Sequence, residues 1–160
     1  MSIYMKYGNI NGSVTTEGFS KWIELHSFQL GVGRGIASAA RSEENREASE
    51  PSVSEVTVSK NMDVSSLNMF EEGLASTMDN KVEIVFTTTT KNKVEEFLRY
   101  ELTHVGLSGY SISAGGEGIP TESLSLNFTK IMMKFAGMGA NVQANAKSAT
   151  YDLTLMKLNP

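Results

Sequence analysis

The sequence contains no cysteine, which excludes disulfide bonds, thiolate catalysis and cysteine-ligated metal sites. Histidine is also scarce, because His26 and His104 are the only two and lie far apart, without partners at metal-ligand spacing. Basic residues are in the minority: 14 lysines and arginines against 18 acidic residues give a formal charge of −4. A chain of this charge does not attract nucleic-acid phosphates. We therefore expect no metal, no cofactor and no nucleic-acid partner.

Long hydrophobic runs are missing as well. No apolar stretch approaches the roughly 18–20 residues that a membrane helix needs, so membrane insertion is not expected. Residues 1–8 lack a basic region followed by an apolar core, and we expect no cleaved signal peptide. What remains is an ordinary globular composition, with 40% hydrophobic and 20% charged residues. The length of 160 residues suffices for a real core and predicts a single domain over residues 1–160.

The most informative stretch runs from Glu122 to Phe135. Apolar and polar residues alternate up to Phe128, as in a half-buried strand, and the alternation resumes at Ile131 one residue out of phase. Because successive side chains on a strand point to opposite faces, this slip requires a bulge, a sharp bend or a change in which face is buried. A long strand with such a phase change is typical of a sheet that curls, as in a barrel or sandwich.

Turn residues separate several further alternating segments. Those at 53–60, 82–90 and 151–155 predict additional strands. Residues 94–107 fit either a helix or a strand, because their apolar positions match both periods. Many strands with one credible helix favour a mainly β fold, either a two-sheet sandwich or a small barrel.

One helix is predicted over about residues 66–78. Asp63, Ser65 and Ser66 offer N-caps at its start. Its apolar residues recur at helical spacing and form one stripe, which consists of Leu67, Phe70, Leu74 and Met78. We predict that this stripe packs against the sheet, so that Phe70→Ala would cost about 3–5 kcal/mol of stability if the ring is fully buried.

Residues 36–52 differ in composition from everything around them. The segment combines small residues with charges of both signs, namely Arg41, Glu43, Glu44, Arg46, Glu47 and Glu50. It cannot bury enough apolar surface to pack by itself, and a loop of this length inside a compact domain is often functional. A short surface helix through residues 39–48, with paired Glu and Arg side chains, is an equally good interpretation.

No pattern in the sequence indicates an active site. Gly31–Gly35 has neither the spacing nor the lysine of a phosphate-binding loop, and turn glycines explain it better. The adjacent acids Glu43 and Glu44, like Glu71 and Glu72, do not converge on one substrate, because neighbouring side chains on a strand or helix point in different directions. We predict that the protein is not an enzyme and has no catalytic residues.

Several short stretches, taken together in their order and spacing, resemble a known family. They are Ile10–Ser13, Lys21–Leu25, Ser27–Phe28, Gly31–Val32, Pro51–Lys60, Asp63, Ser66–Leu67, Glu122–Ile131 and Tyr151–Leu153. In these stretches the chain resembles the haemolysin-coregulated protein (Hcp) family, the inner-tube subunit of bacterial type VI secretion systems. Gln29 and Leu30 depart from the family pattern, in which an aromatic residue usually precedes the glycine.

The resemblance implies a small two-sheet β-barrel with one flanking helix, and it favours a strand for residues 94–107. It also implies a homohexameric ring that stacks into a hollow tube and leaves the bacterial cytoplasm through the type VI apparatus. The implied partners are further copies of the chain, the sheath and spike proteins of the apparatus, and effector proteins in the lumen. The charged segment at 36–52 is then expected to reach the neighbouring ring.

Other functions fit the same strand-rich pattern. A bacteriophage tail-tube protein would share the architecture. A small-ligand-binding β-barrel is a second alternative, although neither a leader peptide nor a continuous apolar cup is visible. A hydrolase fused to a tube domain is a third, but we expect no catalytic extension, because Pro160 follows directly after the last expected strand.

Overall fold

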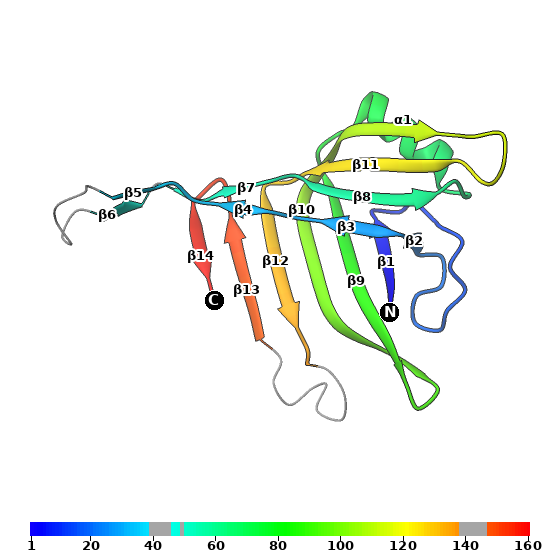
Figure 1. Ribbon diagram of the computed structural model, residues 1–160, viewed down its shortest axis with the longest axis horizontal. Helices are drawn as coiled ribbons and strands as arrows, with labels where there is room; N and C mark the ends of the chain where they lie inside the picture. Colours follow the sequence, from blue (N-terminus) through cyan, green and yellow to red (C-terminus); the bar gives the residue numbers. More distant parts are fainter. Residues whose placement is uncertain (39–45, 49, 138–146) are drawn as a thin grey trace.

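The computed structural model of the chain describes residues 1–38, 46–48, 50–137 and 147–160, with the backbone alone for 36–38 and 46–48. The described part is mainly β with one short helix (Figure 1), as predicted. The first half contains β1 (Ser2–Tyr7), β2 (Ile23–Leu25), β3 (Ser27–Gln29), β4 (Val32–Gly33), β5 (Ile36–Ser38), β6 (Arg46–Ala48), β7 (Ser52–Val53) and β8 (Val56–Asn61). The second half contains α1 (Ser66–Ala75), β9 (Asn80–Thr90), β10 (Lys93–Ser113), β11 (Thr121–Asn127), β12 (Lys130–Phe135), β13 (Lys147–Asp152) and β14 (Lys157–Asn159).

Antiparallel pairing joins most of these strands into one sheet, whose two parts run in different directions (Figure 1). Neighbouring strands follow the order β2–β1–β9–β10–β11–β8–β3. β3 follows β2 after a single residue, His26, whose backbone N–H donates to the Ser59 carbonyl at 2.8 Å. Strands β12, β13 and β14 continue the sheet beyond β10, and β14 is its outermost strand within the described residues.

The phase slip in residues 122–135 corresponds to a bend that two strands share. β11 and β12 both pair with β10, on either side of a break where Thr129 N–H donates to the Thr103 carbonyl at 3.1 Å. The buried residues of β10 change phase at the same level, where His104 adopts a φ of 51°. The pair therefore turns together from one part of the sheet into the other. Of the three outcomes that the phase slip allowed, namely a bulge, a bend or a change of buried face, the structure shows a bend between β11 and β12. Residues 94–107 form a strand, as the resemblance implied.

Two apolar clusters lie on opposite faces of β1 and β9. The main core lies between the two parts of the sheet and takes alternating side chains from β1, β8, β9, β10 and β11. On the other face, the loop 8–22 folds back over Tyr4 and Val85 and buries Phe19 and Trp22. The Phe19 and Trp22 rings meet edge to face, with 5.2 Å between their centroids. The single tryptophan is thus a core residue.

Helix α1 contradicts the predicted packing of its apolar stripe. The four residues of the stripe are exposed instead of buried: Leu67 at 68%, Phe70 at 48%, Leu74 at 73% and Met78 at 43%. The helix also ends at Ala75, so Met78 lies beyond it. The prediction that this stripe packs against the sheet was therefore wrong, because another face of the helix is buried.

Close approach and hydrogen bonding, rather than the strongest apolar periodicity, decide which face of α1 is inward. Met69 is fully buried, and a Cβ on Gly73 would lie only 3.4 Å from the Cβ of Tyr110 in β10. Ser66 is also buried, because it takes part in a polar network described below. The spacing of Ser66, Met69 and Gly73 is as helical as that of the predicted stripe, so periodicity alone could not choose between the two faces.

This orientation reverses the expected effect of two neighbouring substitutions. Met69→Ala is expected to lower the free energy of unfolding by about 2–5 kcal/mol, because it leaves a cavity in the core. Phe70→Ala should cost about 1 kcal/mol, since its half-exposed ring keeps mainly an aromatic contact with Tyr110, 5.9 Å between centroids. Urea denaturation of both variants measures the difference. A larger cost for Phe70→Ala than for Met69→Ala would contradict the observed packing.

A two-stranded arm projects from the sheet (Figure 1). β4 pairs with β7, and further along the arm β5 pairs with β6. This pairing excludes the surface helix that residues 39–48 could have formed as a whole, because 46–48 are extended. Of the charged residues in the expected ring-stacking loop, Glu50 is exposed, whereas Arg41, Glu43, Glu44 and the side chains of Arg46 and Glu47 lie outside the described residues.

Candidate functional site

In the part of the chain that the structure describes, no three His, Asp or Glu side chains come together in a group that could hold a metal ion. His26 exposes its side chain, and His104 Nδ1 lies 3.7 Å from Asp79 Oδ1 at the surface. Glu71 is exposed, whereas Glu72 accepts a hydrogen bond from Asn80 Nδ2 at 3.3 Å, so the two acids do not converge. The candidate functional sites are therefore surfaces of the protein. Buried contacts hold in place the elements that carry these surfaces.

The glycines at 31–35 belong to the arm. Gly31 N–H donates to Ser54 Oγ at 2.8 Å, and Ser54 N–H donates to the Gly31 carbonyl at 2.8 Å. Val32 and Gly33 form β4. The interpretation of these glycines as turn and backbone positions rather than a phosphate loop agrees with this geometry.

A buried polar network ties α1 to the sheet. Lys60 of β8 and Glu122 of β11 are directly opposite each other, both fully buried, with 2.6 Å between Nζ and Oε1. Ser66 donates to the same carboxylate oxygen at 2.6 Å, and the Tyr110 hydroxyl donates to the other at 2.5 Å. Lys60 Nζ also lies 3.0 Å from Asp63 Oδ1. Both buried charges are thus paired and hydrogen-bonded, as their desolvation requires.

This network was not predicted from the sequence, although the sequence contains a signal for it. Lys60 continues the inward phase of Val56 and Val58, and Glu122 precedes the inward Leu124. A lysine and a glutamate in the buried phases of two separate strands are an indication that they neutralise each other, because unpaired charges are almost never fully buried. Only the strand order shows that β8 and β11 are neighbours.

The network controls two ionisation states. Burial raises the pKa of Glu122, but hydrogen bonds from Lys60, Ser66 and Tyr110 outweigh it and leave the pKa below its usual value of 4.5. Burial, and then the bond to this carboxylate, raise the pKa of Tyr110 to about 12. At neutral pH the carboxylate is therefore ionised and the phenol protonated, which is the state that the hydrogen bonds require.

The lowered pKa of Glu122 predicts a specific loss of stability in acid. A carboxyl group whose folded pKa is depressed contributes stability above its unfolded pKa and loses it as the pH falls through the folded pKa. The urea midpoint should therefore fall below about pH 4.5 in the wild-type protein. In Glu122→Gln, which cannot titrate, the stability is lower at pH 7 but should fall less from pH 5 to pH 3. Equal slopes for the two proteins would contradict the assignment.

Among the exposed apolar side chains of the described structure, two groups stand out. The first, the helix surface, consists of Met62, Val64, Leu67, Phe70, Leu74 and Met78. The second, the C-terminal surface, consists of Met133, Phe135, Lys147, Ala149 and Leu158 on one face of β12, β13 and β14. Monomeric proteins seldom leave contiguous apolar patches of this kind uncovered, unless the patches bind something.

The C-terminal surface continues the face of the sheet that packs in the main core, but other parts of the described chain do not bury it. Ile131 is buried and pairs with Tyr151, which pairs in turn with Leu158. Directly paired residues point to the same face, so the side chains two residues further along β12, Met133 and Phe135, continue this face. They are 43% and 42% exposed. The apolar face therefore runs from the core into solvent.

Comparison with known proteins identifies the fold. The family model described as "Type VI secretion system effector, Hcp" matches residues 4–135. No curated protein matches the sequence significantly. The chain resembles a solved structure described as a type six secretion system protein, with a TM-score of 0.88, 21% identity and 99% coverage of each chain.

Two further solved structures are similar. Hcp1 from Salmonella typhimurium has a TM-score of 0.78 and 20% identity, with 99% of this chain and 98% of that chain covered. The tube-terminating cap of the anti-feeding prophage has a TM-score of 0.58 and 10% identity, with 84% and 88% covered. At these identities the likeness establishes a shared fold. No helix in the described ranges is long and apolar enough to cross a membrane.

Proposed function

Because the chain belongs to the Hcp family of type VI secretion proteins, we propose that it is a structural subunit of the hollow inner tube of that apparatus. The family match, which extends over residues 4–135, is the observation that carries the proposal. Solved structures of Hcp proteins with the same fold support it, as does the likeness to a tube cap from a prophage. The protein acts by assembly and not as an enzyme.

In this proposal the assembling unit is a homohexameric ring of single-domain subunits, each a small β-barrel with α1 on its flank. The strand order supports a barrel. β2 pairs with β1 at one end of the order from β1 to β8, β3 pairs with β8 at the other end, and only His26 separates β2 from β3 along the chain. Closure removes the unpaired strand edges that would otherwise aggregate. Strands β12 to β14 then extend from the barrel wall.

The ring is tested by measuring the mass of the purified protein. Light scattering coupled to size exclusion should give about six times the 17.4 kDa of one chain, and negative-stain images should show rings with a central hole. A clean monomer at micromolar concentration would overturn the proposal. A bacteriophage tail-tube protein would also form rings, and neighbouring genes distinguish the two: sheath and secretion ATPase, or capsid and tape measure.

Rings stack into the tube through the arm, in which residues 36–52 reach the next ring. The charges of both signs at Arg41, Glu43, Glu44, Arg46, Glu47 and Glu50 suit a contact that repeats identically along a tube. Arg41→Glu combined with Arg46→Glu should leave the ring intact in solution and abolish secretion. If the double variant does not form rings, these arginines belong to the contact between subunits of one ring. If it is secreted normally, the proposed role of these arginines in stacking is contradicted.

The proposed route starts in the bacterial cytoplasm and ends outside the cell, through the type VI apparatus and without a cleaved signal peptide. The sheath surrounds the tube, a spike protein caps it, and effector proteins occupy its lumen. No bound metal or cofactor is needed for this role. Elemental analysis that finds stoichiometric zinc or iron in the purified protein would contradict that statement.

A further inference from the structure

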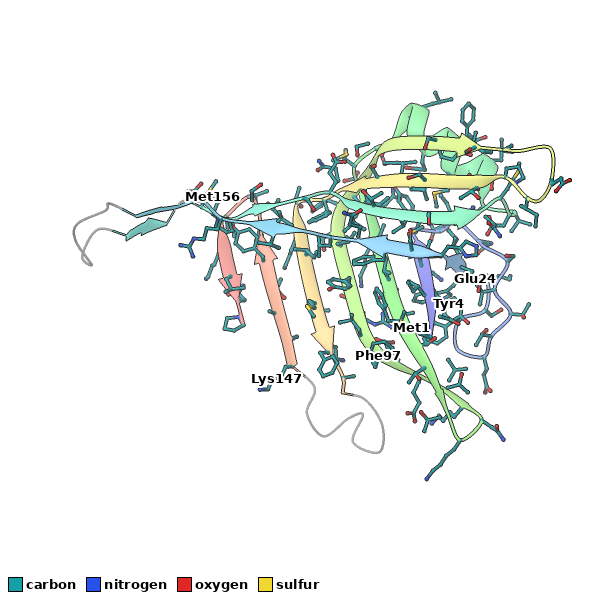
Figure 2. All side chains as sticks on the ribbon, in the orientation of Figure 1. Met1, Tyr4, Glu24, Phe97, Lys147 and Met156 are labelled. Carbon is teal, nitrogen blue, oxygen red and sulfur yellow. The ribbon has the colours of Figure 1, made fainter. Side chains whose placement is uncertain are left out.

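Apart from the projecting arm, the helix surface and the C-terminal surface lie at opposite ends of the body of the molecule (Figure 1). α1 lies at one end of this body, whereas β13 and β14 lie at the other, next to the base of the arm, and the rest of the sheet separates them. Figure 2 places Lys147 at the lower end of β13 and Met156 near the upper end of this strand, beside the base of the arm. Neither surface can cover the other within one chain.

Their charges are of opposite sign. Residues 61–80 contain four acidic side chains and no lysine or arginine. Asp63 is paired with Lys60, which leaves Glu71, Glu72 and Asp79 along the helix surface. Residues 129–160 contain four lysines and one acidic residue. The two ends of the molecule therefore attract each other between copies, although each would repel its own kind.

The lysines flank the C-terminal surface on both sides of the sheet. Lys147 pairs with Phe135 and lies on the apolar face itself. Lys130 and Lys134 lie on the opposite face of β12, and Lys157 on the opposite face of β14, as the alternation of each strand requires. Within the described residues, no carboxylate lies within 4.0 Å of any of these lysine ammonium groups. Lys130 and Lys157 both lie directly opposite Asp152 in the sheet, whereas Lys134 and Lys147 lie opposite Ser148 and Phe135. The charge of Lys134 and Lys147 is therefore available to a partner.

We propose that the helix surface of one subunit packs on the C-terminal surface of the next, and that this contact closes the ring. The inference rests on the proposed function, and it names the surfaces through which the subunits meet. Apolar side chains of α1 then complete the exposed core face of β12 to β14. The acidic Glu71, Glu72 and Asp79 approach Lys147, the one of the four lysines that lies on this face.

A contact between two different surfaces is heterologous, so each subunit uses one surface of each kind. Such contacts continue from copy to copy until the rotation closes into a ring, in which every helix surface and every C-terminal surface is covered. A two-fold contact of helix against helix would instead oppose like charges and leave both C-terminal surfaces exposed. Charge complementarity and the burial of apolar surface thus both favour the heterologous contact over the two-fold one.

Two arginine substitutions, each on an exposed residue, test the pairing. Leu74→Arg damages the helix surface and Phe135→Arg damages the C-terminal surface, and each alone should convert the ring into monomers of 17.4 kDa. Mixed in equal amounts at high concentration, the two variants should form a heterodimer of about twice 17.4 kDa and nothing larger, because one intact surface remains on each chain. Thr89→Arg, an exposed substitution at the far end of β9, is the matched control and should keep the ring. Far-ultraviolet circular dichroism and melting temperature check folding.

The outcomes separate the inference from the proposed function. If the wild type forms rings and either variant still does, the damaged surface does not join subunits and binds another protein or nothing. If Phe135→Arg alone forms a dimer, the helix surface pairs with itself, and the heterologous contact is overturned. Absence of a heterodimer in the mixture, when both variants are folded monomers, overturns it too. A monomeric wild type removes the proposed ring together with the contact.

Discussion

Lys60→Met is expected to lower the free energy of unfolding by about 3–5 kcal/mol. The methionine fits the volume of the lysine side chain, so packing changes little. Glu122, however, would keep a buried carboxylate without its counter-charge, and the loss of the 2.6 Å pair is what costs stability. Part of the cost appears as protonation of Glu122, so the variant should be relatively more stable in mild acid. Urea denaturation at pH 7 and pH 5 measures both effects.

Two further variants show whether the buried pair is responsible. Lys81→Met removes an exposed lysine, whose ammonium lies 3.6 Å from Glu83 Oε1, and should cost less than about 1 kcal/mol. Lys60→Met combined with Glu122→Leu removes both buried charges and should recover part of the stability. Recovery is incomplete, because Ser66 and Tyr110 lose their shared acceptor. Equal costs for Lys60→Met and Lys81→Met would contradict the account.

Gly12→Ala should be the most damaging of the glycine substitutions in the N-terminal loop. A Cβ at this position would lie 2.3 Å from the Trp22 carbonyl oxygen and 2.7 Å from the Ile23 Cα. Both are backbone atoms, which cannot turn aside as a flexible side chain would. The loop that buries Trp22 must move, at a cost of about 3 kcal/mol or more, as for severe overpacking. Thermal melting measures the loss, and the emission of the single tryptophan should shift toward that of an exposed indole.

Gly116→Ala is the matched control for this effect. Its added Cβ would meet no atom within 4 Å, and its φ is not positive. The same chemical change should therefore leave stability within about 0.5 kcal/mol, or raise it slightly by restricting the unfolded chain. A melting temperature for Gly12→Ala equal to that of Gly116→Ala would mean that the loop can retreat from Gly12 without cost.

The sequence was informative where local alternation and tertiary environment agree. Strand alternation predicted an irregularity before Ile131, because a slip of the apolar phase requires a bulge, a bend or a change of buried face. It did not show that β10 bends at the same level, since that requires knowing that β10 is the neighbour of both β11 and β12. Pairing between distant segments is not encoded in the period of either one.

The helix illustrates the opposite case. Its position was predicted to within a few residues, because caps and helical spacing are local properties. Its buried face was predicted wrongly, because Leu67 and Leu74 are more apolar than the Ser66 and Gly73 that face the sheet. An apolar stripe identifies a surface whose burial is favourable. It does not show whether that surface is buried within the same chain or against another copy.

By itself, the sequence determined that this is a Cys-free, acidic, strand-rich chain with one helix, and its ordered short motifs indicated the Hcp family. The tertiary structure alone decided that Lys60 meets Glu122, that Gly12 lies against the backbone of Trp22, and that the helix stripe faces outward. The reason is physical: composition and periodicity are sums over neighbouring residues. Burial, ion pairing and close approach depend on which distant segments the fold brings within a few ångströms.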